Sequence, residues 1–144
     1  MEYHLVVFEE TSVPKNYKDF LGWFYKQLEC NEDHEYDDPS VSSKALQNWF
    51  MEIIKLFPQK KGPYALGADE LKKMKDNHED DHITNYIIGK DMILGDFAWS
   101  LLGKGETVVV EQLAKKYEVG FFEPFEDKII LHNGEIINLR LFLK

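Results

Sequence analysis

Apolar and polar positions alternate along the first third of the chain in patterns that predict one strand and one helix. Residues 3–8, YHLVVF, are rich in β-branched and aromatic side chains, which is typical of a central strand. Ser12 and Pro14 then stand where a helix cap and a first helical turn are expected. Apolar residues follow at helical spacing, namely Tyr17, Phe20, Leu21, Phe24 and Leu28. Gly22 inside this helix costs about 1 kcal/mol relative to alanine, which predicts that something packs closely there.

A second amphipathic stretch covers residues 42–57 and is followed by a loop. Ser42 or Ser43 is expected to cap this helix, and Pro58 to end it. Its apolar stripe consists of Leu46, Phe50, Ile53, Ile54 and Phe57. Two prolines and two glycines in residues 58–67 predict a loop that leads into a short helix from Asp69 to Asp76.

The second half of the chain has the pattern of β-hairpins around one helix. Residues 83–88 and 92–99 are β-rich runs separated by Gly-Lys-Asp, which suits a tight hairpin. Residues 105–117 have helical periodicity, and a strand that Pro124 ends comes next. Asn133-Gly134 then divides residues 128–143 into two strands, because Asn-Gly is a strong hairpin signal.

This order of elements predicts an α+β fold in a single domain that spans residues 1–144. We expect a mixed or antiparallel sheet with a split β-α-β core of the ferredoxin-like kind. About three main helices are expected to pack on one face of the sheet, and a C-terminal β-hairpin to extend it.

Composition restricts the location and the thiol chemistry of the chain. No apolar run approaches the ~20 residues of a membrane span, and Glu2 stands where a signal peptide would carry basic residues. We therefore expect a cytoplasmic protein with no membrane partner. Cys30 is the only cysteine, which excludes an internal disulfide and a thiolate zinc cluster within one chain. We expect it to be half-buried at the end of a helix.

The net charge of -9 comes entirely from two short segments. Residues 29–38, ECNEDHEYDD, hold six acidic residues, and residues 76–82, DNHEDDH, hold four, with no Lys or Arg in either. The rest of the chain has 16 acidic and 17 basic residues. Such segments repel nucleic-acid phosphates and attract cationic surfaces, so we expect no nucleic-acid partner.

Residues 78–82, HEDDH, fit the pattern H-E-x-x-H, which places two zinc-binding imidazoles and a general base on one face of a helix. Here, however, the residues after His82 alternate as in a strand, so that the two histidines would not share a helical face. A third ligand is also not evident, since the position six residues after His82 is Ile88. We therefore predict no metal site and no cofactor, and keep a metal-dependent hydrolase centred on His78, Glu79 and His82 as the alternative.

The acidic segments are the candidate partner-binding surface. Tyr36 lies among carboxylates, and an aromatic anchor within a charged rim is typical of an interface that docks a basic partner. The predicted partner-binding residues are Glu32, Asp33, Glu35, Tyr36, Asp37, Asp38, Glu79, Asp80 and Asp81. No catalytic residue is predicted, because no phosphate-binding glycine loop or nucleophile elbow is present in the sequence.

The stretches EYDDPS, LQNWFMEIIKLFP, GPYA, GDFAWS and KKYEVGFFEP resemble a set of small uncharacterised bacterial proteins. In size and acidity the chain is similar to immunity proteins encoded beside secreted polymorphic toxins. This resemblance implies a non-enzymatic inhibitor that sits on a toxin domain. Separately, we expect a monomer or a homodimer. Besides the hydrolase, a housekeeping domain with no visible partner chemistry remains an alternative.

Overall fold

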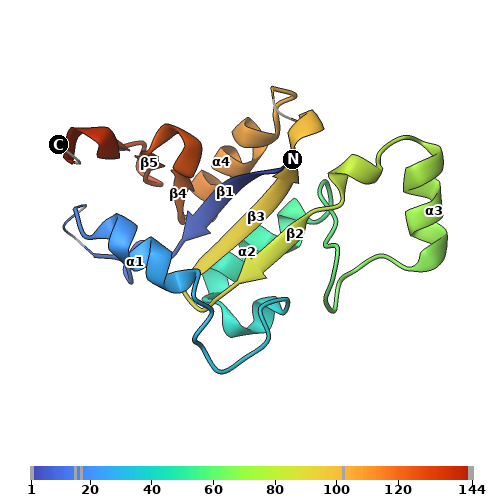
Figure 1. Cartoon of the computed structure of the whole chain (residues 1–144), viewed down its shortest axis with the longest axis horizontal. Coiled ribbons are helices and arrows are strands. Elements are labelled where there is room, and N and C mark those ends of the chain that lie inside the picture. The colour runs from blue at the N-terminus through green and yellow to red at the C-terminus, as the bar shows by residue number, and fades with distance from the viewer. Residues whose placement is uncertain (1, 15, 17, 102, 143–144) are drawn as a thin grey trace.

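Strand β1 (Glu2–Phe8) lies in the middle of a six-stranded antiparallel sheet (Figure 1). The computed structural model describes residues 2–14, 16, 18–101 and 103–142. The order of strands across the sheet is β2-β3-β1-β4-β5-β6. The other strands are β2 (Asn85–Ile88), β3 (Met92–Ala98), β4 (Gly120–Glu123), β5 (Lys128–Ile130) and β6 (Ile136–Asn138).

The pairing of the strands determines their directions. Strand β1 is antiparallel to both β3 and β4, so β3 and β4 run in the same direction on either side of it. Strand β2 is antiparallel to β3 and therefore runs in the same direction as β1. Helix α4 (Glu106–Lys116) lies between β3 and β4 in the chain, and three α-helices of the described ranges lie between β1 and β2.

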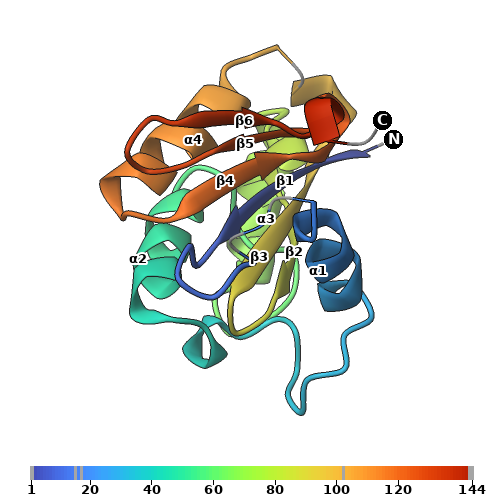
Figure 2. The same ribbon diagram turned by 90° about the vertical axis from the view of Figure 1, so that its left-hand side faces the viewer.

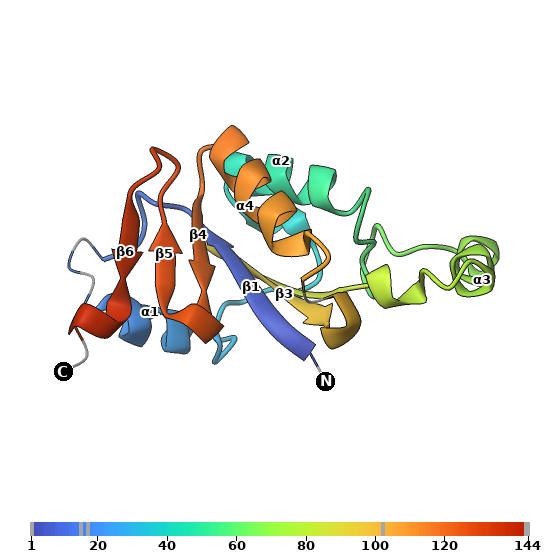
Figure 3. The ribbon, with the colours of Figure 1, turned by 90° about the horizontal axis from the view of Figure 1, so that it is seen from above.

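Helices cover both faces of the sheet, so the prediction that they pack on one face is wrong. Figure 3 shows α2 (Lys44–Ile53) and α4 on one side and α1 (Phe20–Gln27) on the other. The physical reason is found in β1, where Leu5 and Val7 join the core under α2 while Val6 and Phe8 join the core under α1. All four side chains are buried, and a strand that is apolar on both faces needs cover on both.

The two cores differ in composition. The core under α2 and α4 is built around Trp49, Phe50 and Phe97, and the core under α1 around Phe8, Phe20 and Phe122. Rings in the second core meet edge to face, with 5.0 Å between the centroids of Phe20 and Phe122. Buried aromatic side chains thus contribute a large apolar area to each core, together with the aliphatic residues around them.

Helix α3 (Ala68–Asp76) stands apart from the sheet on two extended connections (Figures 1 and 3). None of its residues is buried. Its first turn carries Asp69 and Glu70, and its last turn carries Lys73 and Lys75. Acidic residues at the N-terminus and basic residues at the C-terminus interact favourably with the helix dipole and stabilise the helix. The short helix expected after the proline-rich loop is therefore confirmed.

Helix α1 begins later than the sequence predicts, at Phe20, with Asp19 at its N-cap position. Ser12 lies in a turn before the helix, Pro14 lies in irregular structure, and Tyr17 lies outside the described residues. A Cβ atom added at Gly22 would meet no atom within 4 Å, so the close packing expected there is absent. Cys30 is exposed rather than half-buried, with its backbone in the left-handed region at φ 53°.

Other predictions about local structure are confirmed. The hydroxyl of Ser43 accepts a hydrogen bond from the Leu46 backbone N–H at 3.3 Å and caps α2. Strands β2 and β3 form the expected hairpin, and β5 and β6 form the C-terminal one, which continues the sheet beyond β4 (Figure 2). The last strand is shorter than predicted, because β6 ends at Asn138 and Leu139–Phe142 is a 3-10 helix. Within the described ranges, no helix has the length and apolar character needed to cross a bilayer.

Candidate functional site

The structure separates the two acidic segments and does not bring the nine predicted residues onto one surface. Residues 29–38, called the acidic loop below, reach the end of β2, where the Tyr36 carbonyl accepts a hydrogen bond from Ile88 N–H at 2.9 Å. Glu79, Asp80 and Asp81 precede the start of the same strand. Four residues of extended strand span ~13 Å, so the two segments form separate patches.

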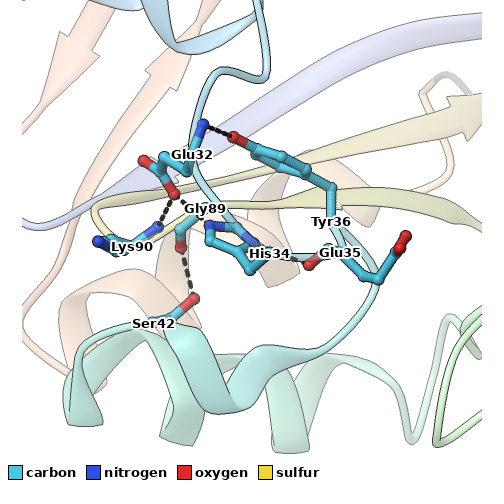
Figure 4. Close-up of polar contacts among 7 residues, drawn as sticks. All are labelled: Glu32, His34, Glu35, Tyr36, Ser42, Gly89 and Lys90. Atoms are coloured by element: carbon cyan, nitrogen blue, oxygen red, sulfur yellow. Dashed lines mark hydrogen bonds and ion pairs between the residues drawn. The ribbon is translucent and has the colours of Figure 1, made fainter.

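The acidic loop is anchored to the turn between β2 and β3 by Glu32 (Figure 4). One oxygen of this carboxylate accepts hydrogen bonds from the Lys90 backbone N–H, at 3.0 Å, and from the His34 imidazole. Beneath the loop, the Ser42 hydroxyl donates to the Gly89 carbonyl at 2.6 Å. The loop is thus tied to a hairpin turn that is almost 60 residues away in the sequence.

Both nitrogens of His34 face hydrogen-bond acceptors. Nε2 lies against the Glu32 carboxylate, and Nδ1 lies 2.8 Å from the backbone carbonyl of Glu35. Burial on its own lowers the pKa of His34 and Lys90 acts in the same direction, but the two hydrogen bonds outweigh them and the pKa is raised. The doubly protonated ring is favoured because a neutral imidazole has one N–H and satisfies one of the two acceptors.

Tyr36 completes the anchoring of the acidic loop. Its hydroxyl oxygen accepts a hydrogen bond from the Glu32 backbone N–H at 2.7 Å, and its ring lies against His34 with 4.5 Å between centroids. The side chain is partly buried, and burial raises the pKa of its hydroxyl. Tyr36 therefore helps to position the loop.

Alternation along the loop decides which acidic side chains face solvent. Glu32, His34 and Tyr36 turn toward the hairpin, whereas Asp33 and Glu35 are exposed. Asp37 and Asp38 are partly buried at the end of the loop. The Asp38 carboxylate accepts a hydrogen bond from Ser40 N–H at 2.9 Å, which lowers its pKa. Asp33 and Glu35 are thus the carboxylates that the acidic loop presents most fully.

The second acidic patch lies beside a different part of the fold. Glu79 and Asp80 are exposed, and Asp81 is partly buried in the short 3-10 helix Asp80–His82. The Asp81 carboxylate accepts a hydrogen bond from the Ser100 hydroxyl at 3.0 Å. This patch is therefore linked to the end of β3, not to the acidic loop.

The HEDDH residues do not form the single helical turn that the zinc pattern requires. Helix α3 ends at Asp76, and His78 has a left-handed backbone with φ 58°. His82 lies in the next 3-10 turn, where its ring stacks on Phe57 with 5.5 Å between centroids. Among the residues that the structure describes, no group of three His, Cys, Asp or Glu side chains is arranged to hold a metal ion.

Sequence reasoning missed the partners of the acidic loop. Lys90, Gly89 and Ser42 contribute backbone groups and a hydroxyl, which have no distinctive sequence pattern. The one available signal was His34, a histidine flanked by carboxylates at alternating positions.

Comparisons of this chain with protein-family models, with curated proteins and with solved structures found no match.

Proposed function

We propose that this protein is a non-enzymatic binding protein, an immunity-type inhibitor that docks a basic toxin domain through the acidic loop. The observation that carries the proposal is the anchoring of this loop by Glu32, His34 and Tyr36, which leaves Asp33 and Glu35 exposed on a fixed backbone. Docking on a loop that is already ordered avoids the entropy loss of ordering it on binding.

Charge supports a basic partner. The acidic loop holds six acidic residues and no Lys or Arg. An excess of one sign of charge on an exposed loop accelerates association with an oppositely charged surface. The second patch, Glu79, Asp80 and Asp81, adds negative charge at the other end of β2. It would strengthen the negative electrostatic field that attracts the partner, without touching the partner itself.

The resemblance to immunity proteins supports the same class of function, in the cytoplasm and as a monomer or homodimer. The hydrolase alternative has less support, because His78 and His82 lie on separate turns. A housekeeping role predicts no partner whose binding depends on Asp33 and Glu35, so the experiment below distinguishes it.

We also infer that β1 to β4 form a ferredoxin-like core with α2 and α4. The strand order β2-β3-β1-β4 supports this inference, as do the shared directions of β1 with β2 and of β3 with β4. Each pair is then a split β-α-β unit with one strand between its members. The hairpin of β5 and β6 would be an addition at the edge of this core.

A charge-matched pull-down tests the binding proposal. The wild-type protein is immobilised and exposed to a lysate of its source cells, beside an Asp33→Asn/Glu35→Gln variant and an Asp69→Asn/Glu70→Gln control. Both variants remove two exposed carboxylates, but the control removes them from α3. We expect a basic protein to be retained by wild type and control and lost from the loop variant, and its toxic activity to fall when wild-type protein is added. Equal retention by all three would refute the proposal.

A further inference from the structure

A small pocket lies where the start of β1 meets the ends of β3 and β4. It has a volume of about 200 Å³ and is lined by Tyr3, Trp99, Glu123, Phe125 and Glu126 among others. Trp99 belongs to the 3-10 turn after β3, and Phe125 and Glu126 to the 3-10 turn after β4. This volume suits a single side chain, since pockets for drug-sized ligands are larger.

Aromatic side chains form much of its wall. Tyr3 and Trp99 meet edge to face, with 6.1 Å between ring centroids. Trp99 is 41% exposed and Phe125 is 72% exposed, although large aromatic residues are usually more deeply buried. Exposed aromatic faces beside a pocket attract cations through their ring quadrupoles.

Carboxylates give the pocket negative charge. Glu123 is partly buried, and this burial raises the pKa of its carboxyl. Lys128 faces it across the β4–β5 pair and acts in the opposite direction, yet the pKa remains raised. Glu126 is exposed at the rim. Glu106 lies nearby but is buried, and its two oxygens accept from the backbone N–H groups of Gly103 and Lys104.

A buried hydroxyl also lies in the pocket wall. Tyr3 is only 8% exposed, and among the described residues the Glu106 carboxylate is the neighbouring acceptor for its hydroxyl, without a hydrogen bond of normal geometry. Burial and the neighbouring Glu106 raise its pKa, so the hydroxyl stays protonated. Because Glu106 can accept from the O–H, the hydroxyl oxygen of Tyr3 is left to accept a hydrogen bond from a ligand.

His4 also lines the pocket, but it is already paired. Its Nε2 lies 2.5 Å from the Asp96 carboxylate, which is on the neighbouring strand β3. The imidazole therefore does not compete for Glu123.

We propose that this pocket binds the guanidinium group of an arginine side chain. A guanidinium carries five N–H donors and stacks on aromatic rings, so it can serve the Glu123 carboxylate and the Tyr3 hydroxyl oxygen while lying against Trp99 or Phe125. A quaternary ammonium would use the aromatic wall but has no N–H to donate. A lysine ammonium is more strongly hydrated and lacks the planar fork.

This site goes beyond the docking of the acidic loop and is independent of it. Tyr3 lies near one end of β1, whereas the acidic loop lies at the turn before Met92, which pairs with Phe8 at the other end. The second acidic patch lies at the same end of β3 as the pocket, because the Asp81 carboxylate accepts a hydrogen bond from Ser100, the residue after Trp99. An arginine at the pocket would therefore approach through a field of negative charge.

Titration with short peptides tests the proposal directly. The peptide Gly-Arg-Gly is compared with Gly-citrulline-Gly, which has the same shape without the charge, while the indole N–H signals of ¹⁵N-labelled protein are recorded by NMR. We expect Gly-Arg-Gly to shift the Trp99 signal in a saturable way with a Kd on the order of 1 mM, a weak affinity fitting one side chain. The Trp49 indole, which donates to the Val110 carbonyl in the core, serves as the internal control and should not move.

Two variants separate binding from folding. Glu123→Gln keeps the shape of the wall and should weaken Gly-Arg-Gly binding about tenfold, since charge-assisted hydrogen bonds are the strong ones. Tyr3→Phe should weaken it several-fold, with both variants retaining the wild-type Trp49 signal. Equal shifts with the arginine and citrulline peptides, or unchanged affinity in Glu123→Gln, would overturn the proposal and leave the acidic-loop proposal standing.

Discussion

One carboxylate oxygen of Glu32 accepts hydrogen bonds from both the His34 imidazole and the backbone N–H of Lys90. This shared acceptor joins the acidic loop to the β2–β3 turn. The geometry favours protonated His34, so we expect the anchoring of the loop to depend on pH.

Stability should therefore include a contribution from His34 that is lost at high pH. A raised pKa in the folded state means that the contribution is complete below the usual histidine value of 6.5 and disappears as pH rises through the raised value. We expect the difference in unfolding free energy between wild type and His34→Phe to be largest below the usual histidine pKa and to shrink as pH rises above it. Phenylalanine keeps a ring against Tyr36 but donates no hydrogen bond. Urea unfolding at several pH values measures the difference, and a constant value would show that His34 is not coupled to the loop.

The Tyr36 hydroxyl should stabilise the loop measurably. Tyr36→Phe removes the acceptor of the Glu32 backbone N–H, which should lower the unfolding free energy by about 1 kcal/mol. Tyr25→Phe is the matched control, because Tyr25 is 62% exposed. Chemical denaturation compares the two, and an equal loss in both variants would contradict the assigned role.

Two glycines should respond to alanine in opposite ways. A Cβ atom at Gly120 would lie 2.3 Å from the ring of Phe8, which is buried and cannot yield, so Gly120→Ala should destabilise the fold by about 1–3 kcal/mol. The space around Gly22 is open, and Gly22→Ala should stabilise α1 by roughly 0.5–1 kcal/mol. Thermal unfolding of both variants tests the packing of the core under α1. A destabilised Gly22→Ala variant would mean that α1 packs differently.

The hydrolase alternative makes a prediction about zinc. Since His82 stacks on Phe57 and His78 lies on a separate turn, we expect purified protein to hold far less than one zinc per chain. Elemental analysis of wild type, His78→Ala and His82→Ala measures this. One tightly bound zinc in wild type that is lost in both variants would favour the hydrolase.

Local sequence signals predicted most of the elements but not their arrangement. Ser43 as a cap, the Gly-Lys-Asp turn and Asn133-Gly134 act on neighbouring residues, and all three were read correctly. The sequence did not predict that α1 lies on the opposite face of the sheet. The apolar residues at consecutive positions 5–8 of β1 indicate that both faces of the strand are covered, but they do not identify the helix that covers each face.

The candidate site could be predicted in part. The acidic loop was recognised from charge alone, yet the inward turn of Glu32 and Tyr36 depends on Lys90 and Ile88, which are more than 50 residues away. The pocket beside Trp99 was not predicted. Its residues come from four separate segments, and none of them is unusual within its own stretch of sequence.

The association rate with the captured basic partner tests the central claim most directly. Stopped-flow mixing at about 0.1 M and about 1 M salt compares wild type, Asp33→Asn/Glu35→Gln and Asp69→Asn/Glu70→Gln, because the Debye length falls from ~10 Å to ~3 Å over this range. If the acidic loop docks the partner, the loop variant should associate several-fold more slowly than wild type and the α3 control at low salt, and the three rates should converge at high salt. Association rates that change neither with the loop substitutions nor with the salt concentration would contradict the claim.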